Sequence, residues 1–148
     1  MLDGRPLIDV HLHAARRPTV KLDWQSTWLA GFADPRLDEV YDEAGTIRPA
    51  AFDQLLADEG VDIAIVLSEY SPKVTGYQPV EDLLPLAAGS NRVRFAANIN
   101  PHLHHPVADE LQRQLELGAI ALKVHPVHGG FPANDRALYP AYELCQAA

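Results

Sequence analysis

The stretch VDIAIVL, residues 61–67, is nearly continuous in apolar residues. Such a run is typical of a parallel β-strand that is covered on both of its faces. Three other short segments have the composition of buried strands. We therefore predict a parallel sheet with strands at residues 7–12, 61–67, 93–99 and 119–124.

Amphipathic segments separate these strands and predict helices. In the segment 48–60, Phe52, Leu55 and Leu56 fall on one face, and Pro49 stands near the start. The other segments of this kind are 79–89, 106–118 and the stretch from about 134 onward. The order of strands and helices predicts an α/β fold with right-handed crossovers, and 148 residues suffice for one domain with a sizeable core.

Composition and charge exclude several classes of protein. Apolar residues make up 47% of the chain, which argues against disorder. The net charge of −8 and the lack of a basic patch argue against a nucleic-acid partner. No apolar run approaches a membrane span, and the start of the chain does not resemble a signal peptide. The single cysteine, Cys145, excludes an internal disulfide and leads us to expect a cytoplasmic protein.

Two features depart from a plain alternation of strands and helices. Residues 14–48 are too many for an ordinary βα loop, and they contain Trp24 and Trp28. We expect this insertion at the mouth of a site, where the tryptophans either contact a substrate or form a local core. The chain also stops within its last predicted helix without a helix-ending signal, so we expect it to be a fragment.

The tripeptide HLH occurs first at the end of the first predicted strand. Side chains two residues apart in a strand point to one face, so we expect His11 and His13 to share a face with Asp9. Two imidazoles at the carboxyl end of a parallel strand can bind one divalent metal ion. Because the chain has seven histidines, such a pair can also arise by chance, and its context has to decide.

The second HLH, at residues 102–104, has a different context. Pro101 and Pro106 frame it in a turn before a helix, where strand alternation cannot aim both rings together. It follows the third predicted strand and so lies near the mouth of the same site. The context therefore favours His11 and His13 over the second pair as metal ligands, while a chance pairing stays open for both.

The fourth predicted strand carries further candidates for catalysis. In the segment GAIALKVHP, residues 118–126, Lys123 and His125 share one face of the strand. A lysine in an apolar strand is costly unless it has a partner or a polar role. Either Lys123 forms a structural bridge with a carboxylate such as Asp9, or Lys123 and His125 form a polar centre with the first-strand histidines. His128, beyond the strand, is expected in an exposed loop.

These residues resemble those of the amidohydrolase superfamily. The motif IDVHLH at 8–13, followed by KVHP at 123–126 and by FPANDRALYPAYE at 131–143, is most similar to the branch of aminocarboxymuconate-semialdehyde and resorcylate decarboxylases. The resemblance implies a metal-dependent (β/α)8 barrel in which His11 and His13 are metal ligands. A complete barrel needs about 250 residues. Residues 1–148 would then be the N-terminal half of such a barrel, with an insertion at 14–48.

The resemblance also implies a chemistry for the site. A divalent metal, expected to be zinc, activates a water molecule that attacks a carbonyl group, or it orients a carboxylate for loss of CO2. The expected partner is a small molecule with a carbonyl or carboxylate group, which Ser68 or Tyr70 could also contact. Family members complete the site with histidines on the fifth and sixth strands and an aspartate on the eighth, which this chain does not contain. Hydrolysis and decarboxylation both stay open, as does carboxylation of Lys123.

Two alternatives to an active enzyme remain. A half barrel would leave its first and fourth strands with unpaired edges, and such a chain would be inactive or would pair with a second copy as a homo-oligomer. The other alternative is a small flavodoxin-like binding module. It would need a glycine-rich phosphate loop or an acidic pocket after the first strand, and the segment HLHAARRPTV at 11–20 offers neither.

Overall fold

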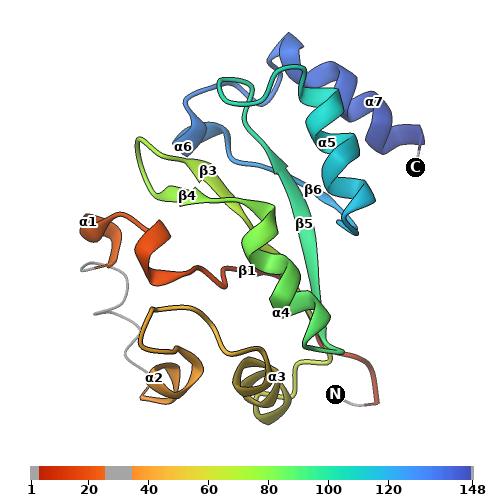
Figure 1. Ribbon diagram of the computed structural model, residues 1–148. Coiled ribbons are helices and arrows are strands. Elements are labelled where there is room, and N and C mark those ends of the chain that lie inside the picture. The colour runs from red at the N-terminus through yellow and green to blue at the C-terminus, as the bar shows by residue number, and fades with distance from the viewer. Residues whose placement is uncertain (1–3, 26–34, 148) are drawn as a thin grey trace.

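Four parallel strands form the central sheet of this protein (Figure 1). A computed structural model describes residues 4–25 and 35–147. The strands are adjacent in the order β1-β2-β5-β6, so β1 and β6 form the edges of the sheet. All four predicted strands are confirmed, although β6 has only three residues. Their bounds are Ile8–Leu12 for β1, Ile63–Leu67 for β2, Val93–Ile99 for β5 and Leu122–Val124 for β6.

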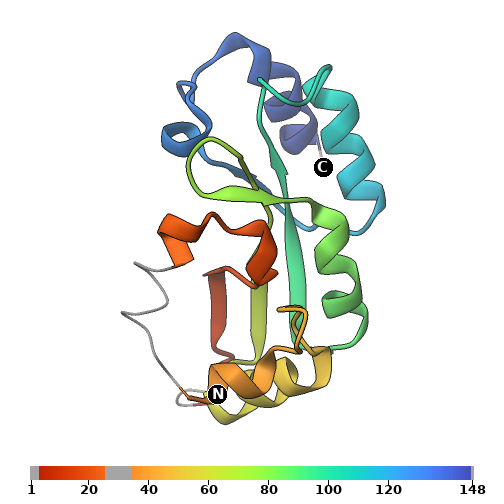
Figure 2. The same cartoon turned by 60° about the vertical axis from the view of Figure 1, so that its left-hand side comes forward.

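Helices follow the strands and pack along one side of the sheet, which Figure 2 shows for α4 and α5. Pro49 stands in the first turn of α3, where its missing N–H leaves no hydrogen bond unmade. Short 3-10 turns at Val80–Leu83 and Arg136–Leu138 lead into α4 and α7. The sheet curls within this outer layer of helices, as in part of a (β/α) barrel, and the predicted fold class is confirmed. The helices span Pro49–Asp58 (α3), Leu84–Ala88 (α4), Val107–Glu116 (α5) and Tyr139–Ala147 (α7).

The hydrophobic core lies between the sheet and these helices. Val66 and Ala97 on the sheet, and Leu111 and Leu138 on the helical side, are fully buried. This core explains why the periodicity of the helical segments was readable in the sequence, since each helix turns one apolar face toward the strands.

The opposite face of the sheet is more open than predicted. Ile63 and Ile65 of β2 are only half-buried, and Val10 of β1 is 64% exposed. The prediction that β2 is covered on both faces is therefore only half right. Within the described residues, no second layer of helices covers this inner face of the curled sheet.

The strand order argues against the flavodoxin-like alternative. In a doubly wound sheet the strand order reverses at a switch point, and helices cover both faces. Here the order in the sheet is the order in the chain, with the helices on one side, which is the arrangement of a barrel.

Several short elements complete the fold, and among them the hairpin after β2 was not predicted. The strands β3 (Glu69–Ser71) and β4 (Gly76–Gln78) form an antiparallel hairpin directly after β2. Within the insertion, Val20 pairs with Gly76 of this hairpin, whereas α2 packs beside α3. The first part of the insertion therefore lies near the hairpin. The remaining short helices are α1 (Leu22–Trp24), α2 (Arg36–Val40), α6 (Pro126–Gly129) and a 3-10 turn at Arg17–Thr19.

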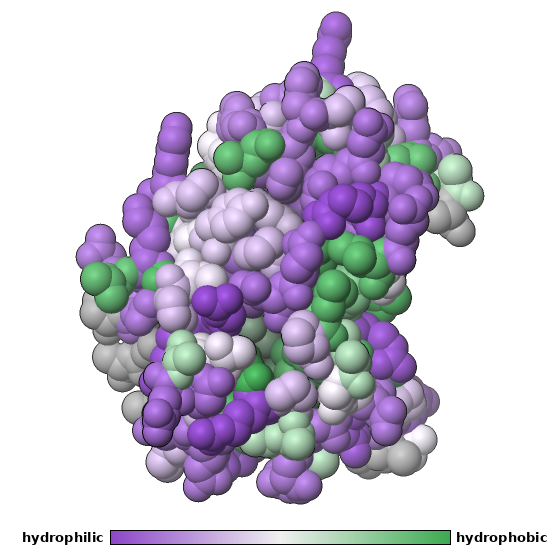
Figure 3. Space-filling model, in the orientation of Figure 1, coloured by the Kyte–Doolittle hydropathy of each residue, from purple (hydrophilic) through white to green (hydrophobic). Residues whose placement is uncertain are grey.

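The face of the molecule seen in Figure 3 is largely hydrophilic, with hydrophobic side chains gathered in a patch between α4 and α5. Helices at the surface of an α/β protein are expected to show such a polar outer side. Among the described residues, no helix combines the length and the apolar character needed to cross a membrane.

Candidate active site

The first strand positions His11 and His13 by a β-bulge and not by plain alternation. From Asp9 to Leu12, three residue steps in β1 match two steps in the paired strand β2. The Asp9 carboxylate accepts a hydrogen bond from the backbone N–H of His11 at 2.9 Å, which stabilises the bulge. Asp9 therefore shares a face with Leu12, and the prediction that it shares one with both histidines is wrong. The His11 and His13 rings still lie close together, with centroids 5.3 Å apart.

Lys123 of β6 reaches the first strand across the curled sheet. Its Nζ lies 3.4 Å from Nε2 of His11. A structural bridge between Lys123 and Asp9, the alternative left open above, is not found among the ion pairs of the described residues. The structure thus brings the predicted residues of the first and fourth strands together.

A second cluster consists of Glu69, His125 and His128. Glu69 begins β3, while His125 immediately precedes the short helix α6 that contains His128. His125 Nδ1 lies 3.1 Å from Glu69 Oε2, and the two imidazole rings have centroids 3.9 Å apart. One ligand atom from each of the three side chains lies within 4.8 Å of the other two.

The surroundings favour neutral imidazoles, which is the form of histidine that binds a metal. Desolvation and then the positive charge of Lys123 lower the pKa of His13 to about 4, against an opposing effect of Glu69. His13 is nevertheless exposed to solvent, so the protein does not enclose this ring. Burial likewise lowers the pKa of His125 and of Lys123, and the Glu69 charge opposes both changes.

The histidines of both clusters line one cavity. Its volume is about 360 Å³, which is within the range of small-molecule sites. Trp24 forms part of the wall, with its ring centroid 5.5 Å from that of His128. Trp28 lies outside the described residues. The other lining residues are His11, His13, Ala15, Arg17, Thr19, Val20, Gln25, Tyr41, Glu69, Thr75, Gly76, Gln78 and His125.

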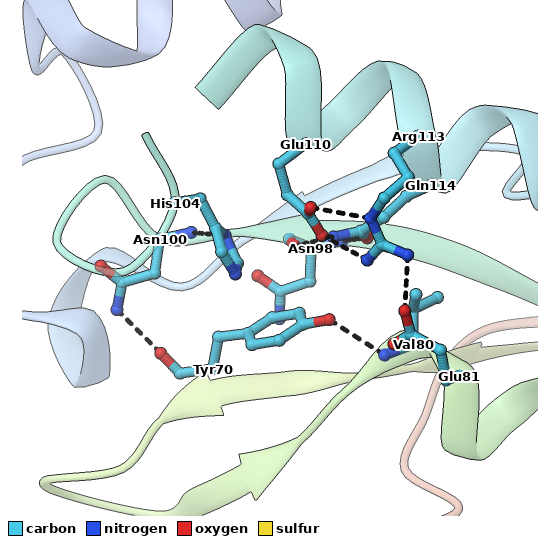
Figure 4. A network of polar contacts seen from close by, with 9 residues as sticks. All are labelled: Tyr70, Val80, Glu81, Asn98, Asn100, His104, Glu110, Arg113 and Gln114. Atoms are coloured by element: carbon cyan, nitrogen blue, oxygen red, sulfur yellow. Dashed lines mark hydrogen bonds and ion pairs between the residues drawn. The ribbon is translucent and has the colours of Figure 1, made fainter. Parts of the chain in front are cut away.

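Two asparagines fix the segment that carries Glu69, and Figure 4 shows the contact of one of them, Asn100, with Tyr70. The Asn98 side-chain amide donates a hydrogen bond to the Ser68 carbonyl at 2.8 Å, and that of Asn100 donates to the Tyr70 carbonyl at 2.7 Å. These two carbonyls belong to the residues on either side of Glu69 in the chain. The backbone of β3 is therefore held at both sides of the carboxylate that enters the cavity.

A polar network behind these asparagines links β5 to α5 (Figure 4). The Gln114 side chain accepts a hydrogen bond from the Asn98 backbone N–H and donates one to the Asn98 carbonyl. Gln114 also donates to Glu110, which receives two further hydrogen bonds from Arg113. Burial raises the pKa of Glu110, but these hydrogen bonds outweigh it and leave the pKa below its ordinary value.

Ser68 and Tyr70, the predicted rim residues, serve the fold instead. Both are almost fully buried, and the Tyr70 hydroxyl accepts a hydrogen bond from the Val80 backbone N–H at 2.9 Å. The expectation that they contact a substrate is therefore wrong. Glu69, which lies between them, reaches the cavity because side chains alternate along β3.

The second HLH also makes structural contacts. His102 Nε2 lies 3.2 Å from the Gly130 carbonyl, and His104 Nδ1 accepts a hydrogen bond from the Asn100 backbone N–H at 3.1 Å. Burial lowers the pKa of His104, which keeps its acceptor nitrogen free of a proton. Neither ring lines the cavity, as predicted from the turn in which they stand.

Two cavity residues, Glu69 and His128, were not predicted as site residues. His128 was expected in an exposed loop, but it is half-buried against Trp24 and His125. The spacing of His125 and His128 was a usable signal, because residues three apart meet on one side of a helical turn. For Glu69, its position two residues after the end of β2 was a signal for the mouth of the site, although its entry into the cavity depends on the hairpin.

Comparisons with known proteins agree with this fold. A family model described as amidohydrolase matches residues 8–148. No curated protein matches the sequence. An uncharacterized TIM-barrel protein from Bordetella bronchiseptica has a similar structure, with a TM-score of 0.63 and 15% sequence identity. The likeness covers 97% of this chain and 52% of that protein, so the chain spans about half its length.

Proposed function

The chain belongs to the amidohydrolase family, and we propose that it provides part of the active site of a metal-dependent, hydrolase-type enzyme. The observation that carries this proposal is the cavity in which histidines from β1 meet histidines that follow β6. The carboxyl ends of parallel strands are where active sites form in (β/α) barrels. The substrate in this proposal is a small molecule with a carbonyl or carboxylate group.

His11 and His13 fit the role of metal ligands in this proposal. Their rings lie 5.3 Å apart, and the lowered pKa of His13 keeps its imidazole neutral at physiological pH. Imidazole nitrogen suits zinc, which is the ion that we expect. A bound divalent ion would polarise a carbonyl group or a water molecule at the mouth of the cavity.

Lys123 and His125 have separate roles in the proposed site. Lys123, next to His11, places a positive charge where a substrate carboxylate or a developing negative charge is stabilised. His125 is oriented by Glu69, an arrangement that lets an imidazole accept a proton and return it. Either hydrolysis or decarboxylation can use such a pair, so the reaction is assigned only to this level.

Metal analysis of the purified chain tests the proposal. The wild-type protein is expected to retain zinc after dialysis. The double variant His11→Ala/His13→Ala is expected to retain at least one equivalent less. The variant His105→Ala is the matched control, because His105 is exposed and does not line the cavity. Unchanged zinc content in the double variant would contradict the assignment. Turnover of ester and lactone substrates, compared with loss of CO2 from aromatic acids, then separates the two reactions.

A further inference from the structure

We infer that Glu69, His125 and His128 form a second site for a divalent transition-metal ion such as Zn²⁺. This site is separate from the pair on β1, because its ligands come from β3 and from the turn of α6. When the ion is bound, His125 acts as a ligand through Nδ1, so the proton-transfer role proposed above belongs to the form of the protein without this ion.

The spacing of the donor atoms fits a tetrahedral ion. Two ligands of a zinc ion with bonds of about 2.0–2.1 Å lie about 3.3 Å apart. His125 Nδ1 and Glu69 Oε2 are separated by 3.1 Å, close to this value. The donor atoms of all three residues lie within 4.8 Å of one another, so His128 needs only a small side-chain adjustment.

Two atoms of the cluster are buried without a hydrogen-bond partner within the described part of the chain. These atoms are Oε1 of Glu69 and Nδ1 of His128. Buried polar atoms in native proteins nearly always have a partner, and an unpaired one costs free energy. A cation between the two side chains would pair both atoms at once, whereas the hydrogen bond between Glu69 and His125 pairs neither.

The backbone of the cluster is ordered in advance. His125 and His128 stand three residues apart across one helical turn, which places both rings on the same side. Glu69 is held by the hydrogen bonds from Asn98 and Asn100 to the carbonyls of its two neighbours. Ligands on fixed backbone lose little conformational freedom when an ion binds.

The donor set leaves room for a further ligand. Two histidines and one glutamate occupy three positions of a tetrahedral zinc ion, and the fourth is then available to water or to a substrate oxygen. All three residues line the cavity, so the open position would face the space that a small molecule enters. The Trp24 ring lies beside that of His128 in the wall of the cavity.

Titration with Co²⁺, followed by its visible absorption, and calorimetry with Zn²⁺ test this site. His128→Ala and Glu69→Gln are each expected to weaken the binding of one ion at least about tenfold, as loss of a ligand does. His128→Gln serves as a size-matched variant, and far-UV circular dichroism checks that each variant is folded. His105→Ala, at the exposed histidine outside the cavity, is expected to bind as the wild type does.

The double variant His11→Ala/His13→Ala separates this inference from the proposed function. If the double variant still binds an ion and His128→Ala does not bind that ion, the second site stands. The number of ions that the double variant has lost, relative to the wild type, then decides whether His11 and His13 are ligands. If His128→Ala and Glu69→Gln both bind ions like the wild type, the second site is overturned, whatever the β1 variant does. If His105→Ala loses ion binding and the other variants keep it, the ions are bound at His105. That result would overturn both the second site and the ligand role of His11 and His13.

Discussion

Replacement of Asn98 by alanine should destabilise the protein, because it removes one hydrogen bond that supports the wall of the cavity. Asn98 is 2% exposed, and its amide donates to the buried backbone of Ser68, the residue before Glu69. The substitution leaves that carbonyl without this donor and creates a small void. We therefore expect both a loss of global stability and a less ordered Glu69.

The magnitude follows from the burial of both groups. A buried polar group that loses its partner costs about 1–3 kcal/mol, and the void adds to this. We expect the free energy of unfolding to fall by about 2–3 kcal/mol. For a chain of this size each kcal/mol corresponds to about 2–4 °C, so the melting temperature should fall by roughly 4–12 °C.

Urea denaturation followed by far-UV circular dichroism measures this effect. Asn91→Ala is the matched control, since Asn91 lies just before the same strand with an exposed side chain. The control should change the free energy of unfolding by less than about 0.5 kcal/mol. Equal effects of the two substitutions would refute the importance of the Asn98 hydrogen bond.

Other perturbations test further contacts. Gln114→Leu leaves the backbone N–H and carbonyl of Asn98 unpaired, so the free energy of unfolding measured in urea should fall by about 2–4 kcal/mol. The control Gln112→Leu, on the exposed side of α5, should lower it by less than about 0.5 kcal/mol. Similar values for the two variants would contradict the role of Gln114. The lowered pKa of Glu110 means that its stabilising effect is complete above about pH 4.5 and is lost as the pH falls through that lowered pKa. The stability difference between wild type and Glu110→Gln should therefore shrink from about pH 6 to about pH 3, and a constant difference would exclude this role. Gly76 has a φ of +152°, and a Cβ there would overlap the Thr19 carbonyl. Gly76→Ala should therefore lower the free energy of unfolding, measured by thermal denaturation, by at least about 2 kcal/mol. An unchanged stability would disprove the close approach of the two backbones.

Much of the fold could be predicted because the strands and helices have strong local patterns. The apolar run at 61–67 and the amphipathic segment 106–118 were both readable from hydrophobic periodicity. The hairpin of β3 and β4 was not, because strands of three residues carry too little pattern. The bulge in β1 was also hidden, since pairing with β2 and not the sequence of β1 alone determines the register.

The candidate site could likewise be predicted only in part. Strand alternation and the resemblance to a family indicated His11, His13, Lys123 and His125, which the structure brings close together and whose roles stay predictions. Glu69 was not, because its entry into the cavity depends on a hairpin and on hydrogen bonds from β5. Contacts between residues so far apart in the chain arise from the tertiary fold, which short motifs do not report.

Crystallography of the zinc-soaked chain, with data collected on both sides of the zinc absorption edge, tests the metal assignment most directly. We predict anomalous difference peaks in the cavity, one beside His11 and His13 and one among Glu69, His125 and His128. Peaks only at exposed histidines such as His105, or none within bonding distance of the cavity residues, would contradict the central claim that this cavity is a metal site.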